Sequence, residues 1–196
     1  MGRTDCALLC AACWRGCRWI AGGQIRKSFN GAGLDSVRAA GVFEGNLREA
    51  IHAYKFGRKA SFRRPFTALL EGLAEAADLV AWPPSLDASL TERGFDSAGE
   101  LAGSVAGRLK LPLFRGLRRS RQGEKQVSLG REQRWANAEG AYEADASFAL
   151  QGAAVLLVDD VITTGATLNA AALALKAAGA ARVSAVTLAS GELRGN

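Results

Sequence analysis

One segment in the C-terminal part of the chain constrains the fold most strongly. It runs from Val155 to Thr167 and reads VLLVDDVITTGAT. The apolar run 155–158 is typical of a strand buried on both faces of a sheet, and two acids follow it directly. A short loop with two threonines and a glycine comes next, and the Ala/Leu-rich residues 167–178 predict a helix. The segment therefore predicts a strand, a loop and a helix, the unit from which parallel α/β sheets are built.

The same segment predicts an anion site. Backbone N–H groups in such a loop and at the start of a helix attract phosphate, and Gly165 allows the backbone to approach it closely. Two carboxylates would repel phosphate, so we expect Asp159 and Asp160 to face ribose hydroxyls or a cation instead. The segment contains neither a Gly-Lys-Ser/Thr loop nor a GxGxxG fingerprint. The alternative is an ordinary strand–turn–helix in which Asp and Thr only cap the helix.

The rest of the chain alternates strands and helices. We predict strands at residues 36–43, 79–82, 111–117, 155–158 and 183–188, and helices at residues 47–54, 65–77, 96–109 and 167–178. Residues 118–135 are basic and polar without a clear period, which predicts a loop. The expected fold class is α/β, with a mostly parallel sheet flanked by helices. We divide the chain into a small Cys-rich segment, 1–33, and a main domain, 34–196.

Charge is distributed unevenly along the 196 residues. The net charge is +6, but residues 1–64 carry +8 and residues 115–135 carry +5, with acidic stretches between and after them. This alternation indicates a phosphate-rich partner, either nucleic acid or a small phosphorylated ligand, although solvated charged loops would give the same pattern. No apolar run approaches the length of a membrane span and no secretory signal is evident, so we expect no membrane insertion and a cytoplasmic location.

All four cysteines lie near the N-terminus. They are Cys6, Cys10, Cys13 and Cys17, with the spacing C-x3-C-x2-C-x3-C. Such a cluster in a cytoplasmic protein indicates metal binding rather than disulfides, and a helix would place the four on one face. Four ligands so close in sequence are tight for tetrahedral zinc. Structural zinc is favoured, while an absence of bound metal and a metal cluster stay open.

The segment 155–167 resembles the ribose-phosphate signature of the type I phosphoribosyltransferases. In that family the two acids contact the 2′ and 3′ hydroxyls of phosphoribosyl pyrophosphate (PRPP), and the loop holds the 5′-phosphate. The resemblance implies a type I phosphoribosyltransferase-like domain in which Asp159 and Asp160 are the catalytic pair. It also implies a set of phosphate-binding residues: Thr163, Thr164, Gly165, Ala166 and Thr167.

Three further segments resemble the ComF family, which includes competence proteins and gluconate-linked relatives. They are residues 51–59 (IHAYKFGRK), residues 81–96 (with WPPS and ERGFD) and residues 118–142. The resemblance implies that Lys55 and Arg93 contact PRPP, that the basic loop 118–135 closes over the site, and that Mg2+ accompanies PRPP. It further implies an N-terminal zinc knuckle and a role in DNA uptake and natural transformation. Whether the chain transfers the phosphoribosyl group or only binds PRPP stays open.

The alternative function is a non-catalytic accessory module that binds single-stranded DNA or competence proteins. Two basic segments and the Cys-rich end motivate it. Aromatic side chains lie among the basic residues and could stack on bases, although core packing is the expected role of most of them. These aromatic residues are Trp14, Trp19, Phe56 and Phe62.

Overall fold

The structure is a computed structural model that describes residues 10–25, 33–57, 59–85, 96–120, 140–145 and 150–191. A four-stranded sheet lies at its centre, with the strand order β1-β6-β5-β2. All neighbouring strands in this sheet are parallel. The strands are β1 (Ser36–Val42), β2 (Leu79–Ala81), β5 (Ala154–Ile162) and β6 (Arg182–Ser190). A separate antiparallel pair consists of β3 (Leu117–Arg119) and β4 (Tyr142–Ala144).

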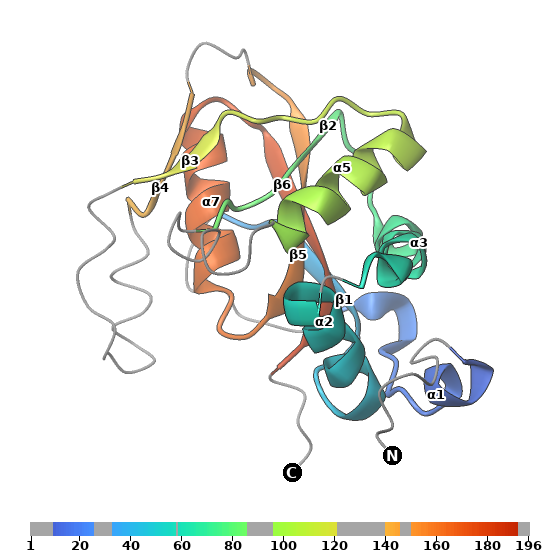
Figure 1. The fold of residues 1–196 in the computed structure, drawn as a ribbon. Coiled ribbons are helices and arrows are strands. Elements are labelled where there is room, and N and C mark those ends of the chain that lie inside the picture. Colours follow the sequence, from blue (N-terminus) through green and yellow to red (C-terminus); the bar gives the residue numbers. More distant parts are fainter. Residues whose placement is uncertain are drawn as a thin grey trace.

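Helices cover both faces of the central sheet (Figure 1). One face carries α7 (Ala166–Ala177) together with the β3–β4 pair. The other face carries three helices: α2 (Gly45–Gly57), α3 (Arg63–Leu73) and α5 (Ser97–Leu109). This arrangement confirms the predicted α/β class with a parallel sheet flanked by helices.

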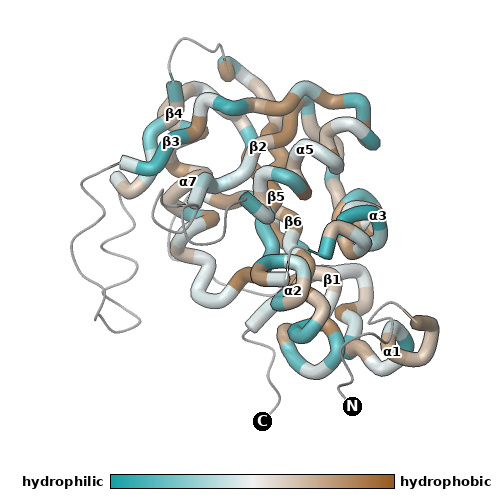
Figure 2. Tube along the Cα trace, in the orientation of Figure 1, coloured by the Kyte–Doolittle hydropathy of each residue, from teal (hydrophilic) through white to brown (hydrophobic). Residues whose placement is uncertain are grey.

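Alternation along β5 explains how one strand serves two cores. Val155 and Leu157 pack into the core beneath α7, whereas Leu156 and Val158 pack into the core beneath α3 and α5. All four are at most 1% exposed. Successive side chains of a strand point to opposite faces, so a strand buried on both sides needs an uninterrupted apolar run. Much of the hydrophobic colouring in Figure 2 accordingly lies in the central strands.

Several predicted bounds require correction. The strand predicted at 155–158 continues to Ile162, because β6 runs beside it as far as Ser190 and supplies backbone partners. Asp159 and Asp160 therefore lie inside the strand. The helix predicted at 65–77 begins at Arg63 and ends at Leu73.

The strand predicted at residues 111–117 is wrong. Pro112 has no N–H to donate, and the segment makes only one parallel bridge, between Leu113 and Val80. The chain then leaves β2, and β3 begins at Leu117 to pair with β4. The predicted loop 118–135 thus starts within a strand, and its residues 121–135 lie outside the described part of the chain.

The N-terminal segment lies along β1. It contains a short helix, α1 (Ala11–Arg15), and a 3-10 turn, η1 (Ala21–Gly23). A single helix that would place the four cysteines on one face is not formed from Cys10 to Cys17, because α1 covers only Ala11–Arg15. Hydrogen bonds from the side chains of Trp19 and Asn46 occupy carbonyls of the last turn, and the helix ends at Gly16. Within the ranges described, no helix is both long enough and apolar enough to span a membrane.

Candidate functional site at the carboxyl edge of the sheet

The carboxyl ends of the four central strands meet at one edge of the sheet. Open parallel sheets bind ligands at this edge. Here β5 and β6 end side by side, with Ile162 in register with Ser190 and the N–H of Gly191 bonded to the Ile162 carbonyl at 2.8 Å. The loop 163–165 follows β5 and leads directly into α7. The predicted phosphate residues therefore lie where the fold offers a ligand site.

The loop is built to expose backbone donors. Gly165 has a φ of +79°, in the left-handed region that favours glycine, and it is the N-cap residue of α7. No side chain caps this helix, and the N–H of Ala166 makes only a 3.4 Å contact with the Thr164 hydroxyl. The side chains of Thr163 and Thr167 are exposed. The first turn of α7 thus has N–H groups and hydroxyls that can meet an anion.

The two signature acids point to opposite faces of β5. Asp160 lies on the same face of β5 as Leu156 and Val158, because residues two apart in a strand point the same way. This face is covered by α2 and α5. Its Oδ2 accepts a hydrogen bond from the Ser97 hydroxyl at 3.0 Å, and its Oδ1 lies 2.8 Å from Lys55 Nζ. Asp159 lies on the other face of β5. Its Oδ1 accepts a 2.8 Å hydrogen bond from the backbone N–H of Asp160.

The electrostatic surroundings of Asp159 favour its neutral form. Burial, and then the negative charge of Asp160, raise the pKa of Asp159 to about 8. The positive charge of Lys55 opposes this shift only in part, because that ammonium is paired with Asp160. The two adjacent carboxyls therefore do not ionise independently, and the neutral form is favoured at Asp159.

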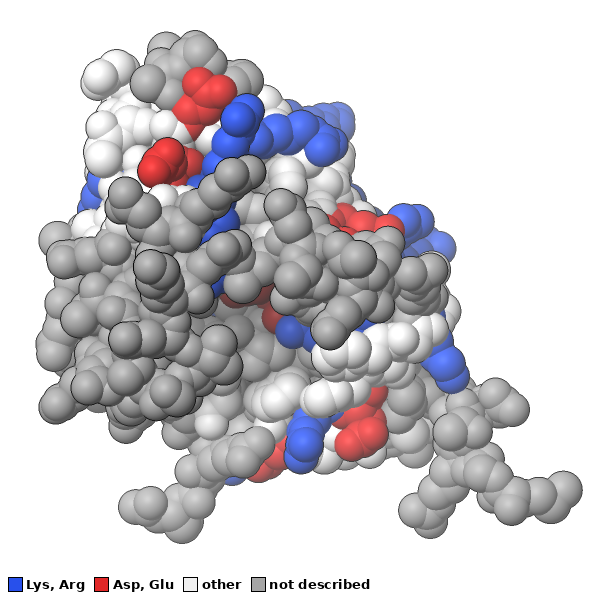
Figure 3. All heavy atoms as spheres, turned by 60° about the vertical axis from the view of Figure 1, so that its left-hand side comes forward, with Lys and Arg blue, Asp and Glu red and all other residues white. Residues whose placement is uncertain are grey.

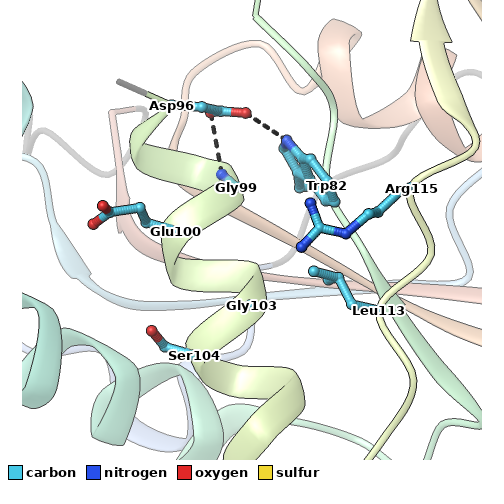
Figure 4. Close-up of a pocket in the computed structure, with 8 residues that line it drawn as sticks. All are labelled: Trp82, Asp96, Gly99, Glu100, Gly103, Ser104, Leu113 and Arg115. Carbon is cyan, nitrogen blue, oxygen red and sulfur yellow. Dashed lines mark hydrogen bonds between the residues drawn. The ribbon is translucent and has the colours of Figure 1, made fainter. Parts of the chain in front are cut away.

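A second set of contacts ties the start of α5 to the segment after β2. Asp96 is the N-cap residue of α5, and its Oδ1 accepts a hydrogen bond from the Gly99 N–H at 3.1 Å. Its Oδ2 accepts another from the Trp82 indole at 2.6 Å (Figure 4). The guanidinium of Arg115 lies over the Trp82 ring, 6.0 Å from its centre, and both side chains line a pocket of about 490 Å³. These contacts fix the position of Ser97, the first residue of α5, beside Asp160.

Tyr54 joins α2 to α5. Its ring is 1% exposed, and its hydroxyl donates a 3.1 Å hydrogen bond to Glu100. Burial and the charge of Glu100 raise the pKa of Tyr54 well above its ordinary value. The helix that carries Lys55 is therefore held firmly against the helix that carries Ser97.

Sequence reasoning missed Ser97, Trp82 and Tyr54 as parts of the site. One local signal was available for the first of them, because the Asp-Ser pair at 96–97 is a typical helix start. Trp82 and Tyr54 lie in two of the segments that resemble the ComF family, but no role at the site was predicted for either side chain. Among the residues that were predicted, Lys55 lies beside Asp160, while Arg93 and Cys6 are outside the described ranges.

None of the described cysteines forms a disulfide, and the thiols of Cys10 and Cys17 bond to nearby backbone groups. Cys10 Sγ accepts a hydrogen bond from the Cys13 N–H at 3.3 Å, and Cys17 Sγ donates to the Cys13 carbonyl at 3.4 Å. Within the described ranges, no three His, Cys, Asp or Glu side chains are arranged to hold a metal ion. The zinc prediction gains no support from these residues.

The aromatic residues proposed for base stacking differ in accessibility. Phe62 is 2% exposed and packs on Phe66, so it belongs to the core. Trp14 and Trp19 are partly buried and lie against each other, with ring centres 4.9 Å apart. Phe56 is 62% exposed. On the face shown in Figure 3, the described basic side chains are interspersed with acidic ones.

Fold and loop together define an α/β domain with a ligand site at the carboxyl edge of a parallel sheet. The model of the phosphoribosyl transferase domain family matches residues 96–194, just over half of the chain. The chain therefore belongs to the phosphoribosyl transferase domain family and to the type I phosphoribosyltransferase superfamily.

Two solved structures are similar to the chain. One is a glutamine PRPP amidotransferase from B. subtilis complexed with ADP and GMP, with 21% identity and a TM-score of 0.49. The other is an allosteric regulatory enzyme of purine biosynthesis, with 20% identity and a TM-score of 0.47. Each match covers 70% of this chain and 30% of the other. No curated protein matches.

Proposed function

We propose that residues 34–196 form a domain that binds PRPP at the carboxyl edge of the sheet and transfers its phosphoribosyl group to an acceptor. The observation that carries this proposal is the order of groups at the end of β5. Two acids precede an uncapped loop and helix start, at the edge where parallel sheets bind ligands. The family match over residues 96–194 supports it.

The proposed roles follow from the chemistry of each group. The loop 163–165 and the first residues of α7 would hold the 5′-phosphate through N–H groups and hydroxyls. Asp159 and Asp160 would accept hydrogen bonds from the ribose hydroxyls and orient the sugar for loss of pyrophosphate. A positive charge develops on the ribosyl group as the bond to pyrophosphate breaks, and the acidic edge would stabilise it.

The carboxylates at this edge of the sheet fit a ligand that arrives as an Mg2+ complex of PRPP. Among the described residues, the charges of Asp160 and Asp96 raise the pKa of Asp159, and the charge of Lys55 lowers it. An acidic edge of this kind would repel a free polyphosphate, whereas a magnesium complex carries less negative charge. Mg2+ prefers oxygen ligands and would neutralise the pyrophosphate as it departs. Arg93 is proposed as a further contact to pyrophosphate on the basis of the family resemblance.

Isothermal titration calorimetry with PRPP, in the presence and absence of Mg2+, tests the proposal. We expect Mg2+-dependent binding that weakens at least about tenfold, or about 1.4 kcal/mol, in Asp159→Asn and in Asp160→Asn. Glu49→Gln, which neutralises an exposed carboxylate on α2, is the matched control and should bind like the wild type. Absence of wild-type binding, or binding that survives both aspartate substitutions, would overturn the proposal.

Transfer is tested separately from binding. Pyrophosphate release from PRPP should depend on a nucleobase or amine acceptor, and screening acceptors would identify the substrate class. Release that requires Asp159 and an acceptor supports an enzyme. Binding without release for any acceptor would support a PRPP-binding protein instead.

The resemblance to the ComF family supports a narrower proposal, a cytoplasmic role in DNA uptake and natural transformation. Replacing the gene by its Asp159→Asn form in a naturally transformable host should lower the transformation frequency. An unchanged frequency would argue against this role and leave PRPP binding unaffected.

A second candidate function is binding of single-stranded DNA. The exposed ring of Phe56 favours it, because that ring stands between Lys55 and Lys59 in a basic stretch of sequence. Phe56→Ala should then weaken binding of an oligonucleotide in a salt-sensitive manner without changing PRPP affinity. Equal oligonucleotide binding by both forms would contradict this function.

The same family resemblance supports a structural zinc held by Cys6, Cys10, Cys13 and Cys17. Elemental analysis of protein expressed with added zinc should find about one zinc per chain. A content near zero would exclude the site.

A further inference from the structure

We propose that Lys55 is a positioning residue that acts on PRPP through Asp160, which it holds in orientation together with Ser97. This inference rests on the proposed function. It assigns Lys55 a different task from the direct phosphate contact that the sequence predicts.

Asp160 is held from two sides by elements far apart in the chain. Lys55 comes from the last turns of α2 and lies 2.8 Å from Oδ1, and Ser97 comes from the first turn of α5 and lies 3.0 Å from Oδ2. The Asp160 side chain is only 8% exposed. One partner on each oxygen prevents rotation of the carboxylate, so the plane of the group is set before any ligand arrives.

The carboxylate retains acceptor capacity in this arrangement. An ionised carboxylate can accept about four hydrogen bonds, and the two contacts use one site on each oxygen. The remaining sites can receive ribose hydroxyls. Pre-orientation of this kind improves binding because the ligand does not have to immobilise the side chain itself.

Burial explains why Lys55 serves Asp160. A carboxylate that is almost completely buried is costly unless a cation and hydrogen bonds compensate it. Without the ammonium, the Asp160 carboxylate would lose its compensating charge and turn toward water, which would spoil its fit to a ribose hydroxyl. The Tyr54–Glu100 hydrogen bond keeps α2 against α5, which holds Lys55 within reach.

The two signature acids are consequently not equivalent. Asp159 makes no ion pair with any described residue, and its partner at 2.8 Å is the backbone N–H of Asp160. Asp160 instead joins β5 to two helices. The Lys55 side chain is 21% exposed, and its ammonium lies 2.8 Å from Asp160 Oδ1.

A double-mutant cycle on PRPP affinity, measured with Mg2+ by calorimetry, tests the inference. We expect Lys55→Met to weaken binding about tenfold in the wild-type background and less than about twofold in the Asp160→Asn background. Lys55→Arg, which keeps the charge, should recover part of the loss. Lys59→Met is the matched control, because it removes an exposed lysine four residues further along and should leave affinity unchanged.

Equal losses from Lys55→Met in both backgrounds would show that Lys55 contacts the ligand directly and would overturn the inference, as would no loss in either. Circular dichroism at each step verifies folding. If Lys55→Met does not fold, Ser97→Ala replaces it in the cycle. Ser97→Ala should lower PRPP affinity a few fold in the wild-type background and should have no effect in the Asp160→Asn background. Wild-type protein that does not bind PRPP overturns the proposed function and this role together. If the wild type binds PRPP but the effects of Lys55→Met and Asp160→Asn on affinity simply add, only the role proposed for Lys55 is overturned.

Discussion

At the scale of single residues, strand alternation separates two acids that are adjacent in sequence. Asp160 faces α2 and α5 and has a cation on one oxygen, whereas Asp159 faces the other side of β5 without an ion pair among the described residues. The same residue type therefore meets two environments one position apart. Two identical neighbours in the sequence have different electrostatic properties because β5 is buried on both faces.

This difference predicts how stability depends on pH. A carboxyl whose pKa is raised in the folded protein binds its proton more tightly there than in the unfolded chain. Stability should then fall as pH rises from about 4, where unfolded aspartate ionises, to about 8, the folded value for Asp159. Asp159→Asn should remove this dependence and stabilise the protein at pH 8 by at least about 1 kcal/mol. Urea unfolding of the wild type and of Asp159→Asn between pH 5 and 8 measures this pH dependence of the unfolding free energy.

Asp160→Asn provides the contrast. It removes the partner of Lys55 and should destabilise the protein at neutral pH, by about 1–3 kcal/mol, since a partly buried ammonium loses its compensating charge. The explanation fails if both aspartate variants change the unfolding free energy in the same direction.

At the scale of elements, the start of α5 is stabilised by one side chain with two tasks. Asp96 caps the helix through the Gly99 N–H and also accepts the Trp82 indole N–H. Asp96→Ala should cost about 1–2 kcal/mol, because both the cap and the indole partner are lost. Trp82→Phe removes the indole donor and some ring volume but keeps the cap, and should cost less. Urea unfolding of the two variants gives the comparison.

The same variants should affect ligand binding through Ser97. If the cap fixes Ser97 beside Asp160, Asp96→Ala should weaken PRPP binding more than Trp82→Phe does. For stability, equal losses of unfolding free energy in Asp96→Ala and Trp82→Phe would indicate that the cap contributes nothing beyond the indole contact.

At the scale of the whole molecule, the N-terminal segment covers an edge of the sheet. β1 is the outermost strand, and residues 18–24 lie along it with hydrogen bonds such as Ile20 N–H to the Ala40 carbonyl at 2.9 Å. Deleting residues 1–25 should leave the β1 edge unpaired, lower Tm and promote self-association, because an open edge strand can pair with another chain. Thermal unfolding and light scattering check both effects.

A point substitution tests the same contact without a deletion. In Gly41→Ala the new methyl group would lie 2.9 Å from the Arg18 carbonyl oxygen and 2.7 Å from Leu47 Cδ2, so the segment or the helix must shift. We expect a lower Tm in this variant as well. An unchanged Tm after the deletion would show that the segment contributes nothing to the sheet.

The sequence by itself determined the fold class, the central strand and the loop that leads into α7. These features depend on local rules: an apolar run for a doubly buried strand, Gly165 for a left-handed turn, and an Ala/Leu-rich helix that starts immediately after it. Local rules failed at residues 111–117, where apolar composition resembles a strand. Pro112 has no N–H for a further ladder hydrogen bond, and the segment makes a single bridge, to Val80 of β2.

Only the tertiary structure decided which side chains surround the acids. Lys55, Ser97 and Asp160 come from α2, α5 and β5, and 63 residues separate Ser97 from Asp160 in the chain. Their meeting depends on the strand order and on which helix covers which face, and no local pattern carries that information. Propensity and periodicity act over a few residues, whereas the ionisation and orientation of a buried carboxylate depend on the elements packed against it.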